Sequence, residues 1–309
     1  MECVGIDVSK RVLTCAVGSE VREFANSEQG FKALGQWSSH AQTWCLEATG
    51  RYHQPLAAYG YEQGLRLLIV NPGRAKKYLD FVASRAKTDR IDAQALQTLG
   101  QRESEACREY RPVPEAVAKA RDILVGRRSL VQARVALEQV ASETGDPGGH
   151  LKSSIATLNA SVKELDKSLL KALKGYPRYA DLLGMPGIGP QSAALLVCAL
   201  ERGEFATSDS LVAFAGLDPR PRESGRFKGT RSLSHQGDAQ LRTVLFMAAR
   251  AGARMPYWKP YYVKQLAKGL STTEATVILA RKMMRVAWKV YKQGSPFIPM
   301  NEPEVDRTT

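Results

Sequence analysis

The chain has 309 residues, of which 44% are apolar, and it carries 44 Lys and Arg against 31 Asp and Glu, a formal charge of +13. This composition is typical of folded domains, with length enough for two, and it excludes a disordered chain. No apolar run approaches the roughly 18 residues of a spanning helix. Residues 1–10 lack the basic start and apolar stretch of a signal peptide, so a cytoplasmic protein without membrane contact is expected.

The positive charge is unevenly distributed along the chain. Residues 1–100 hold 12 basic and 10 acidic groups, whereas residues 101–309 hold the other 32 and 21. Such an excess favours a polyanionic partner such as nucleic acid, although a basic surface that only keeps the protein soluble would look the same. The five cysteines form no CxxC pair and there are only four histidines, so neither a zinc site nor a disulfide framework is expected.

The first hundred residues alternate between strand-like and helix-like segments. Strands are expected at 3–10, 11–19, 20–26, 44–50 and 65–72, the last stopped by Pro72, and helices at 27–39, 53–64 and 88–101, with Ser27 and Thr88 as N-caps. Hairpin-linked strands followed by crossover units predict a mixed sheet flanked by helices.

The middle of the chain predicts two helices separated by the breaker GDPGGH at 145–150. In the second helix the apolar residues step by three and four, which is the spacing of a coiled-coil seam: Ile155, Leu158, Val162, Leu165 and Leu169. The seam would pair with residues 115–143 or with a second subunit, or pack on a domain face.

A third, mainly helical region begins at Gly175 and closes with a helix from Thr272 to Gln293, stopped by Gly294. The expected domains are 1–105, a helical insert at 106–174 and a C-terminal domain at 175–299. A polar tail at 300–309 is expected to be disordered.

Four acids form the first candidate site. Asp7 lies in the first strand, Glu47 ends the fourth, and Asp89 and Asp92 share one face of a helix. If the first strand lies beside the fourth, the four carboxylates converge, and oxygen ligands suit Mg²⁺ or Mn²⁺ acting on a phosphodiester. Taken singly, each acid has a plainer explanation: a turn cap for Asp7, and ion pairs with Arg51 for Glu47 and with Arg85 and Lys87 for the other two.

Two further segments point to nucleic acid. Residues 182–197 are predicted to form two helices joined by PGIG, similar to a helix-hairpin-helix. In such a motif Gly187 and Gly189 would let backbone N–H groups approach a phosphate. The alternative is an ordinary corner between two helices. Residues 219–231 are predicted to form a loop in which Ser224 lies among five cations: Arg220, Arg222, Arg226, Lys228 and Arg231. Such a loop would hold a phosphate; the alternative is a charged segment that is merely solvated.

These motifs together carry a family resemblance. GIDVSK, LEATGRY, VNP, KTDRIDA, PGIGPQSA and AFAGLDPRPRESG resemble the DEDD transposases of the insertion-sequence one-ten type, relatives of the Piv-type DNA invertases, from residue 3 to about 298. The resemblance implies a RuvC-like (ribonuclease-H-like) domain, a coiled-coil insert and a C-terminal transposase domain. It also implies that Asp7, Glu47, Asp89 and Asp92 bind metal and that Ser224 is a nucleophile that forms a phosphoserine bond to DNA.

The sequence therefore predicts a Mg²⁺-dependent transposase or recombinase acting on donor and target DNA. The resemblance further implies a noncoding bridge RNA as guide and a homo-oligomer, dimer or tetramer, in which the acids of one protomer meet Ser224 of another. The alternatives are a Piv-like site-specific invertase, a RuvC-like junction nuclease that uses metal-activated water, and a non-enzymatic DNA-binding architectural protein. Cleavage in Mg²⁺ against EDTA separates the enzymes from the last.

Overall fold

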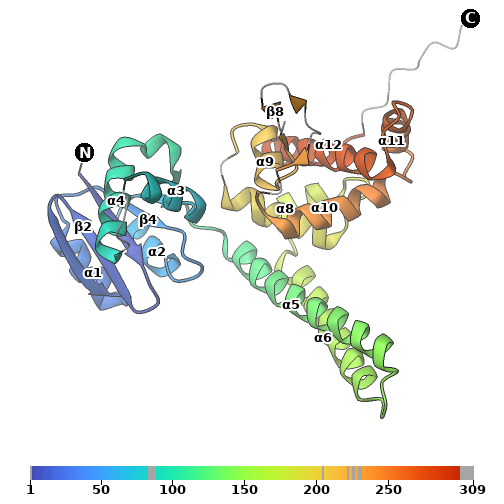
Figure 1. The fold of residues 1–309 in the computed structure, drawn as a ribbon, viewed down its shortest axis with the longest axis horizontal. Helices are drawn as coiled ribbons and strands as arrows, with labels where there is room; N and C mark the ends of the chain where they lie inside the picture. The colour runs from blue at the N-terminus through green and yellow to red at the C-terminus, as the bar shows by residue number, and fades with distance from the viewer. Residues whose placement is uncertain are drawn as a thin grey trace, which may run out of the picture. The chain divides into compact units, whose positions relative to one another are not determined.

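The computed structural model describes residues 2–82, 88–203, 205–220, 223–224, 227–228, 232–234 and 236–299. The chain divides into two compact units, Met1–Pro112 and Val113–Thr309 (Figure 1). Within the described residues, no helix has the length and apolar character to cross a membrane. The tail at 300–309 lies outside the described residues, and the finer domain boundaries at 105 and 174 stay predictions.

Unit 1 is built on a mixed sheet with the strand order β3-β2-β1-β4-β5-β6. β1, β4 and β5 are parallel neighbours, while β2, β3 and β6 join antiparallel. The strands are β1 (Cys3–Val8), β2 (Val12–Val17), β3 (Glu20–Ala25), β4 (Thr43–Glu47), β5 (Arg66–Val70) and β6 (Arg108–Glu109). The predicted mixed sheet is thus confirmed, and the condition that the first strand lies beside the fourth is met. β6 was not predicted.

The helices of unit 1 begin largely where the sequence predicts. They are α1 (Glu28–Trp37), α2 (Gln54–Glu62), α3 (Pro72–Val82) and α4 (Asp89–Arg102), followed by the short 3-10 helix η1 (Ser104–Ala106). Ser27 and Thr88 are the N-caps of α1 and α4, and their side chains accept hydrogen bonds from backbone N–H groups. The sequence reading missed α3 because Pro72 was taken as a strand end; it is the first residue of a helix, where its missing N–H costs nothing.

The two faces of the sheet are covered by different helices. Alternate strand residues such as Ile6 and Leu46 pack with α1 and α2, whereas Cys45 and Leu68 pack with α3 and α4. The backbone of α4 lies directly on β1, since a Cβ added to Gly5 would come within 2.0 Å of the carbonyl oxygen of Ala93. This close approach fixes α4 over β1 and so determines where its N-terminal acids lie.

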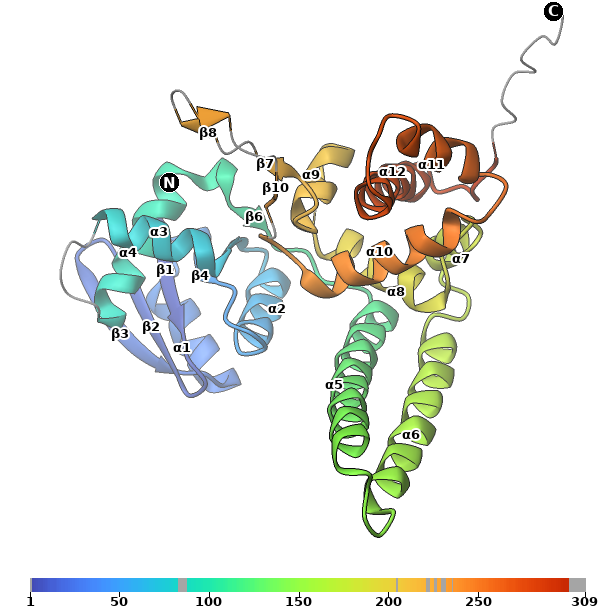
Figure 2. The same ribbon diagram turned by 45° about the vertical axis from the view of Figure 1, so that its right-hand side comes forward.

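Unit 2 begins with a long helical hairpin formed by α5 (Glu115–Thr144) and α6 (His150–Ala172), which lie side by side (Figures 1 and 2). The predicted break is present, and Gly145 ends α5 in the left-handed conformation at φ 71°. Val162 and Leu169 of the apolar seam are buried, and Leu165 lies 3.8 Å from where a Cβ on Gly126 would stand. The seam therefore packs on α5 of the same chain, while supercoiling and pairing with a second subunit stay predictions.

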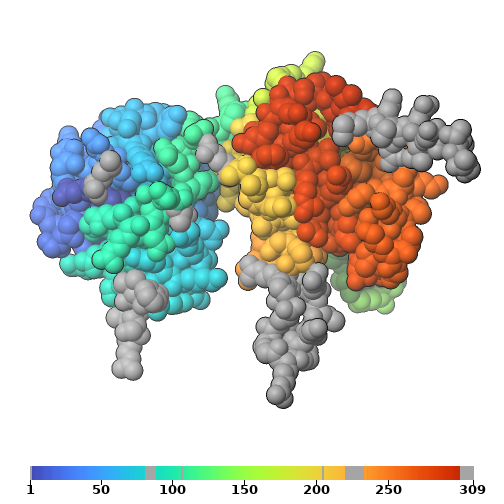
Figure 3. Space-filling model, turned by 90° about the horizontal axis from the view of Figure 1, so that it is seen from above, coloured from blue at the N-terminus to red at the C-terminus, as the bar shows by residue number. Residues whose placement is uncertain are grey.

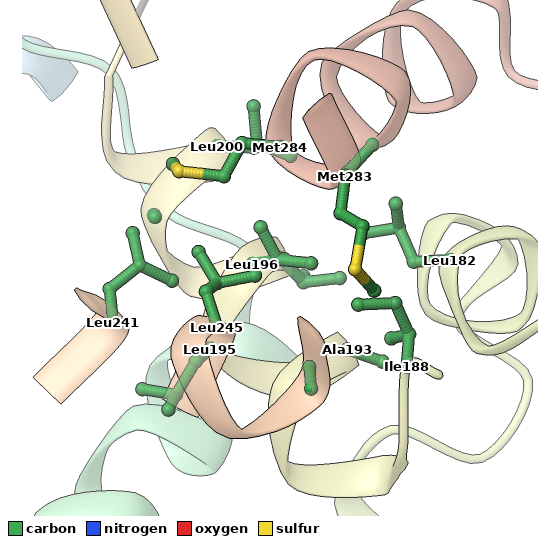
Figure 4. Packing of buried hydrophobic residues seen from close by; sticks show 14 of the residues in the cluster. Leu182, Ile188, Ala193, Leu195, Leu196, Leu200, Leu241, Leu245, Met283 and Met284 are labelled. Atoms are coloured by element: carbon green, nitrogen blue, oxygen red, sulfur yellow. The ribbon is translucent and has the colours of Figure 1, made fainter. Parts of the chain in front are cut away.

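The remaining helices of unit 2 form one core. They are α7 (Pro177–Leu183), α8 (Pro190–Arg202), α9 (Ser208–Phe214), α10 (Ala239–Gly252), α11 (Lys259–Leu266) and α12 (Thr272–Gln293). Leu196, Leu245 and Met283 meet in this core (Figure 4). The end of α12 is capped by Gly294 at φ 64°, as predicted, and its start is capped by Ser271. In the space-filling view, α9 to α12, coloured yellow to red, make a continuous surface (Figure 3).

Candidate functional site

The four predicted acids come from two neighbouring strands and one helix of unit 1. β1 and β4 run parallel with Gly5 opposite Cys45 and Ile6 opposite Leu46, so Asp7 and Glu47 follow at the same end of the sheet. Asp7 lies two residues beyond Gly5, and residues two apart on a strand share a face, which here is the face that contacts α4. Asp89 and Asp92 occupy the first turn of α4.

The electrostatics of Asp7 show that it interacts with each of the other three acids. The pKa of the Asp7 carboxyl is raised from 3.8 to about 6, mainly by burial and then by the negative charges of Asp89, Asp92 and Glu47, in that order. The hydrogen bond from the Val8 N–H opposes this change only in part. The carboxylates of Asp89, Asp92 and Glu47 therefore lie close enough to Asp7 to disfavour its charged form, while Arg85 and Lys87, the partners in the plainer explanation, lie outside the described residues.

These donors match a hard divalent cation in chemistry, because Mg²⁺ and Mn²⁺ prefer carboxylate oxygens. Nevertheless, in the part of the chain that the structure describes, no three or more His, Cys, Asp or Glu side chains are grouped so that they could hold a metal ion. The acids are electrostatic neighbours rather than a formed coordination shell. Binding a cation would require their side chains to draw closer.

The basic segment of unit 2 contains short strands rather than the predicted plain loop. β8 (Glu223–Ser224) pairs with β9 (Phe227–Lys228), so that Ser224 lies opposite Phe227 in the ladder. β7 (Pro219–Arg220) pairs with β10 (Ser232–Leu233), with Arg220 opposite Ser232. These ladders place the backbones of Arg220, Ser224 and Lys228. Arg222, Arg226 and Arg231 lie outside the described residues.

The two ends of this segment are joined to each other by contacts that sequence reasoning missed. The Ser234 N–H donates to the Asp218 carbonyl at 2.9 Å, and the Ser234 hydroxyl donates to the Asp218 carboxylate. Ser234 therefore joins the two ends of the basic segment through Asp218. Asp238 is the N-cap of α10 and accepts from Gln240 and Leu241 at 2.9 and 3.0 Å. Asp238 followed by a helical pattern was a signal that could have been read.

The PGIG turn between α7 and α8 is packed on one side and open on the other. Gly187 has φ +84°, and a Cβ there would lie 3.0 Å from the Ala248 carbonyl oxygen, so this glycine packs against α10. The Trp258 indole N–H donates to the Pro186 carbonyl at 2.7 Å. Gly189, the N-cap of α8, has open space around it. Of the two predicted phosphate-binding glycines, Gly189 is thus the more accessible, and a helix-hairpin-helix function stays a prediction.

A cavity of about 420 Å³ lies beside this turn, between α6 and the start of α8. Asp166 lines it and accepts hydrogen bonds from Arg127 at 2.7 Å and from the Gln191 side chain at 3.1 Å. A phosphate placed here would face a carboxylate, although one that Arg127 balances.

Comparison with known families agrees with this combination of a mixed sheet bearing acids and a helical unit bearing a basic segment. A family model for DEDD transposases of the IS110 type matches residues 4–143, and a second, described as "Transposase IS116/IS110/IS902 family", matches residues 179–263. The chain belongs to the IS110 family of transposases.

Individual relatives include both inversion and insertion-element proteins. The chain is 28% identical to the pilin gene-inverting protein of Moraxella bovis, over 95% of this chain and 97% of that protein. It is 29% identical to an uncharacterized protein of insertion element IS110 from Streptomyces coelicolor, over 47% of this chain and 36% of that protein. It is 30% identical to the transposase for insertion sequence element IS1328 of Yersinia enterocolitica, over 44% and 42% of the two chains.

Proposed function

We propose that this protein is the recombinase of a mobile genetic element and exchanges DNA strands in a Mg²⁺-dependent reaction through a serine nucleophile. The observation that carries the proposal is the raised pKa of Asp7, near 6, to which Asp89, Asp92 and Glu47 all contribute. Acids that repel one another at the end of a sheet are costly for folding, so a cation that binds them is the natural reason to keep them. Family membership supports DNA as the substrate.

The acids would hold the metal from three elements. Asp7 and Glu47 approach from the ends of β1 and β4, and Asp89 and Asp92 from the first turn of α4. A bound Mg²⁺ or Mn²⁺ would supply the positive charge that a phosphodiester needs when it is attacked. The fixed position of α4 on β1 keeps Asp89 and Asp92 close enough to act with Asp7, as their effect on its pKa supports.

Ser224 would provide the attacking oxygen. Its hydroxyl forms a bond to the phosphorus, one ester bond of the DNA backbone breaks, and the serine proton ends on the oxygen that leaves as a hydroxyl. The result is a phosphoserine link that conserves the energy of the broken bond for rejoining. Arg220 and Lys228 lie on the short strands of the same basic segment as Ser224, and with Arg222, Arg226 and Arg231 they would hold the phosphate and stabilise its developing charge.

The test is a recombination assay on DNA that carries the element ends. Asp7→Asn, Glu47→Gln and Asp92→Asn should each lower strand exchange at least about 100-fold, because each removes a metal-binding charge, and EDTA should do the same to the wild type. Glu62→Gln removes an exposed carboxylate of the same unit and should leave the rate unchanged. Full recombination by Asp7→Asn would refute the assignment of the acids.

A noncoding RNA is proposed as the guide that selects the DNA sites. The supporting features are the net charge of residues 101–309, and the PGIG turn and arginine-rich segment, which suit backbone phosphates rather than base edges. In the same assay, protein purified after ribonuclease treatment should be inactive and should recover when the transcript flanking its gene is added. Efficient, site-specific recombination by RNA-free protein would contradict RNA guidance.

A site-specific invertase is the second candidate. It is favoured by the similarity to the pilin gene-inverting protein of Moraxella bovis, which extends over 95% of this chain. An invertase would recombine two fixed sites on one DNA molecule. Activity of RNA-free protein on inverted sites, with the same need for Asp7 and Ser224, would favour this candidate over the transposase.

A further inference from the structure

Three of the five cysteines, far apart in sequence, meet under the C-terminal part of α4. Cys3 on β1 and Cys45 on β4 are buried, and a Cβ added to Gly100 of α4 would lie 2.6 Å from the Cys3 sulfur and 3.2 Å from the Cys45 sulfur. Cys107, just before β6, packs against the same cluster. The Cys45 thiol hydrogen-bonds to both Cys3 and Cys107. We refer to Cys3, Cys45 and Cys107 as the thiol trio.

The members of the thiol trio differ in access to solvent. Cys3 and Cys45 are fully enclosed, with 1% and 0% of their surface exposed, whereas Cys107 is partly exposed. The thiol trio thus joins one cysteine that a small oxidant can reach to a second thiol that is already in hydrogen-bonding contact. This is the arrangement of an attacking and a resolving cysteine.

The surroundings of Cys107 favour its thiolate. A hydrogen bond from Cys45 lowers the pKa of the Cys107 thiol, and the positive charges of Arg74 and Arg66 lower it further, against the opposing effects of burial and of Glu103. Arg74 is held in place by an ion pair with Glu103 at 2.6 Å. Since the thiolate is the nucleophile, these cations increase the reactivity of the one thiol of the trio that solvent reaches.

We propose that Cys107 and Cys45 form a disulfide when the protein meets hydrogen peroxide or a similar two-electron oxidant. The Cys107 thiolate attacks the peroxide, the O–O bond breaks, and Cys107 becomes a sulfenic acid while hydroxide leaves. The Cys45 thiol then attacks the Cys107 sulfur, the S–O bond breaks, and water leaves with the thiol proton. Two thiols and one peroxide thus yield one disulfide and two waters.

The disulfide would form on the strand that carries Glu47. Cys45 lies two residues before Glu47 on β4 and shares its face of the sheet, and Cys107 directly precedes β6, which pairs with β5. The thiols must move from hydrogen-bond contact to a bond of about 2.05 Å. The disulfide would therefore link the C-terminal end of unit 1, at Cys107, to the central strand β4. This is the strand that carries Glu47, a candidate metal ligand.

Peptide mapping of the full chain tests this inference without reference to recombination. Reduced protein is exposed to hydrogen peroxide, free thiols are alkylated, and the digest is analysed by mass spectrometry. The Cys45 and Cys107 peptides should appear joined, at a mass about 2 Da below their sum, and dithiothreitol should separate them. In the Cys107→Ser variant, the rate at which peroxide oxidises the Cys45 thiol should fall by about ten-fold or more.

Cys198 provides the matched control. It is also partly exposed, but it lies on α8 of unit 2 and its thiol donates to the Val117 carbonyl. Cys198→Ser should leave the cross-link unchanged. Two results would overturn the proposal. One is that Cys107 accumulates sulfinic acid while the Cys45 thiol stays free. The other is that Cys45 is oxidised as fast in the Cys107→Ser variant as in the wild type. The wild-type map decides the matter even if a variant fails to fold.

Discussion

Asp7 shows how a single residue links folding to the proposed chemistry. Its carboxyl has a pKa near 6 in the folded chain against 3.8 as the ordinary value, so the folded state holds this proton more tightly than the unfolded state does. The contribution of the protonated group to stability is fully present below pH 3.8 and is lost as the pH rises through 6. At neutral pH, without metal, the acid therefore destabilises unit 1.

We expect Asp7→Asn to stabilise the metal-free protein at pH 8 by about 1–2 kcal/mol, after allowance for solvent screening of this partly exposed group, and to have little effect at pH 4. Asparagine removes the charge that repels Asp89, Asp92 and Glu47. Urea unfolding in EDTA at the two pH values measures the difference. Equal stability of wild type and variant at pH 8 would show that the four acids do not crowd one another.

Sequence reasoning found the acids of unit 1 but not its thiol trio. Asp7 and Glu47 stand out because ionised residues in apolar strands need a reason to be there. Cys3 and Cys45 sit on the same strands, but buried cysteine is an ordinary core residue, so nothing marks it as a cluster until the register is known. Cys107 joins through β6, a strand of two residues that has no periodic signal.

At the scale of elements, α4 connects the two ends of one sheet face. Its first turn carries Asp89 and Asp92, and Gly100 near its end lies over Cys3 and Cys45. Between them, Gly5 of β1 lets the helix backbone come so close that an added Cβ would lie 2.0 Å from the Ala93 oxygen and 2.2 Å from the Gln97 nitrogen. The position of the acids thus depends on a residue without a side chain.

Gly5→Ala should therefore destabilise unit 1 by about 1–3 kcal/mol, because backbone atoms of α4 must shift to admit the methyl group. Moving α4 outward would also lessen the charge repulsion on Asp7 and bring its pKa closer to 3.8. Denaturant unfolding measures the first effect and NMR titration of Asp7 the second. Gly35→Ala in α1, where a Cβ meets nothing closer than 3.5 Å, is the control and should be neutral or stabilising.

The elements that the sequence predicted are those with a clear periodicity and cap, such as α1, α4 and α12. The basic segment was misread as a plain loop because its prolines, glycines and arginines give no alternation, and its ladders are held by pairing across the segment. Tertiary contacts decided its structure, including the Asp218–Ser234 anchor, which joins residues 16 positions apart.

At the scale of the whole molecule, the two units divide the proposed reaction. Unit 1 holds the acids and has nearly balanced charge, while most of the positive charge and Ser224 belong to the rest of the chain. Composition alone revealed this division, since it needs only a count along the sequence. The roles of the individual residues came from the family motifs, because no property of a serine in an arginine-rich segment distinguishes a nucleophile from a phosphate contact.

Trapping a covalent protein–DNA adduct is the most direct test of the central claim that Ser224 exchanges strands with the help of the acids. Protein and substrate DNA are mixed in Mg²⁺ and denatured, and the adduct is sought by gel shift and by mapping of the phosphorylated serine. Wild type and Ser232→Ala should yield the adduct; Ser224→Ala should yield none while its DNA affinity stays within about two-fold, because the flanking cations supply the binding. Free DNA ends without an adduct, or an adduct formed by Ser224→Ala, would contradict this account.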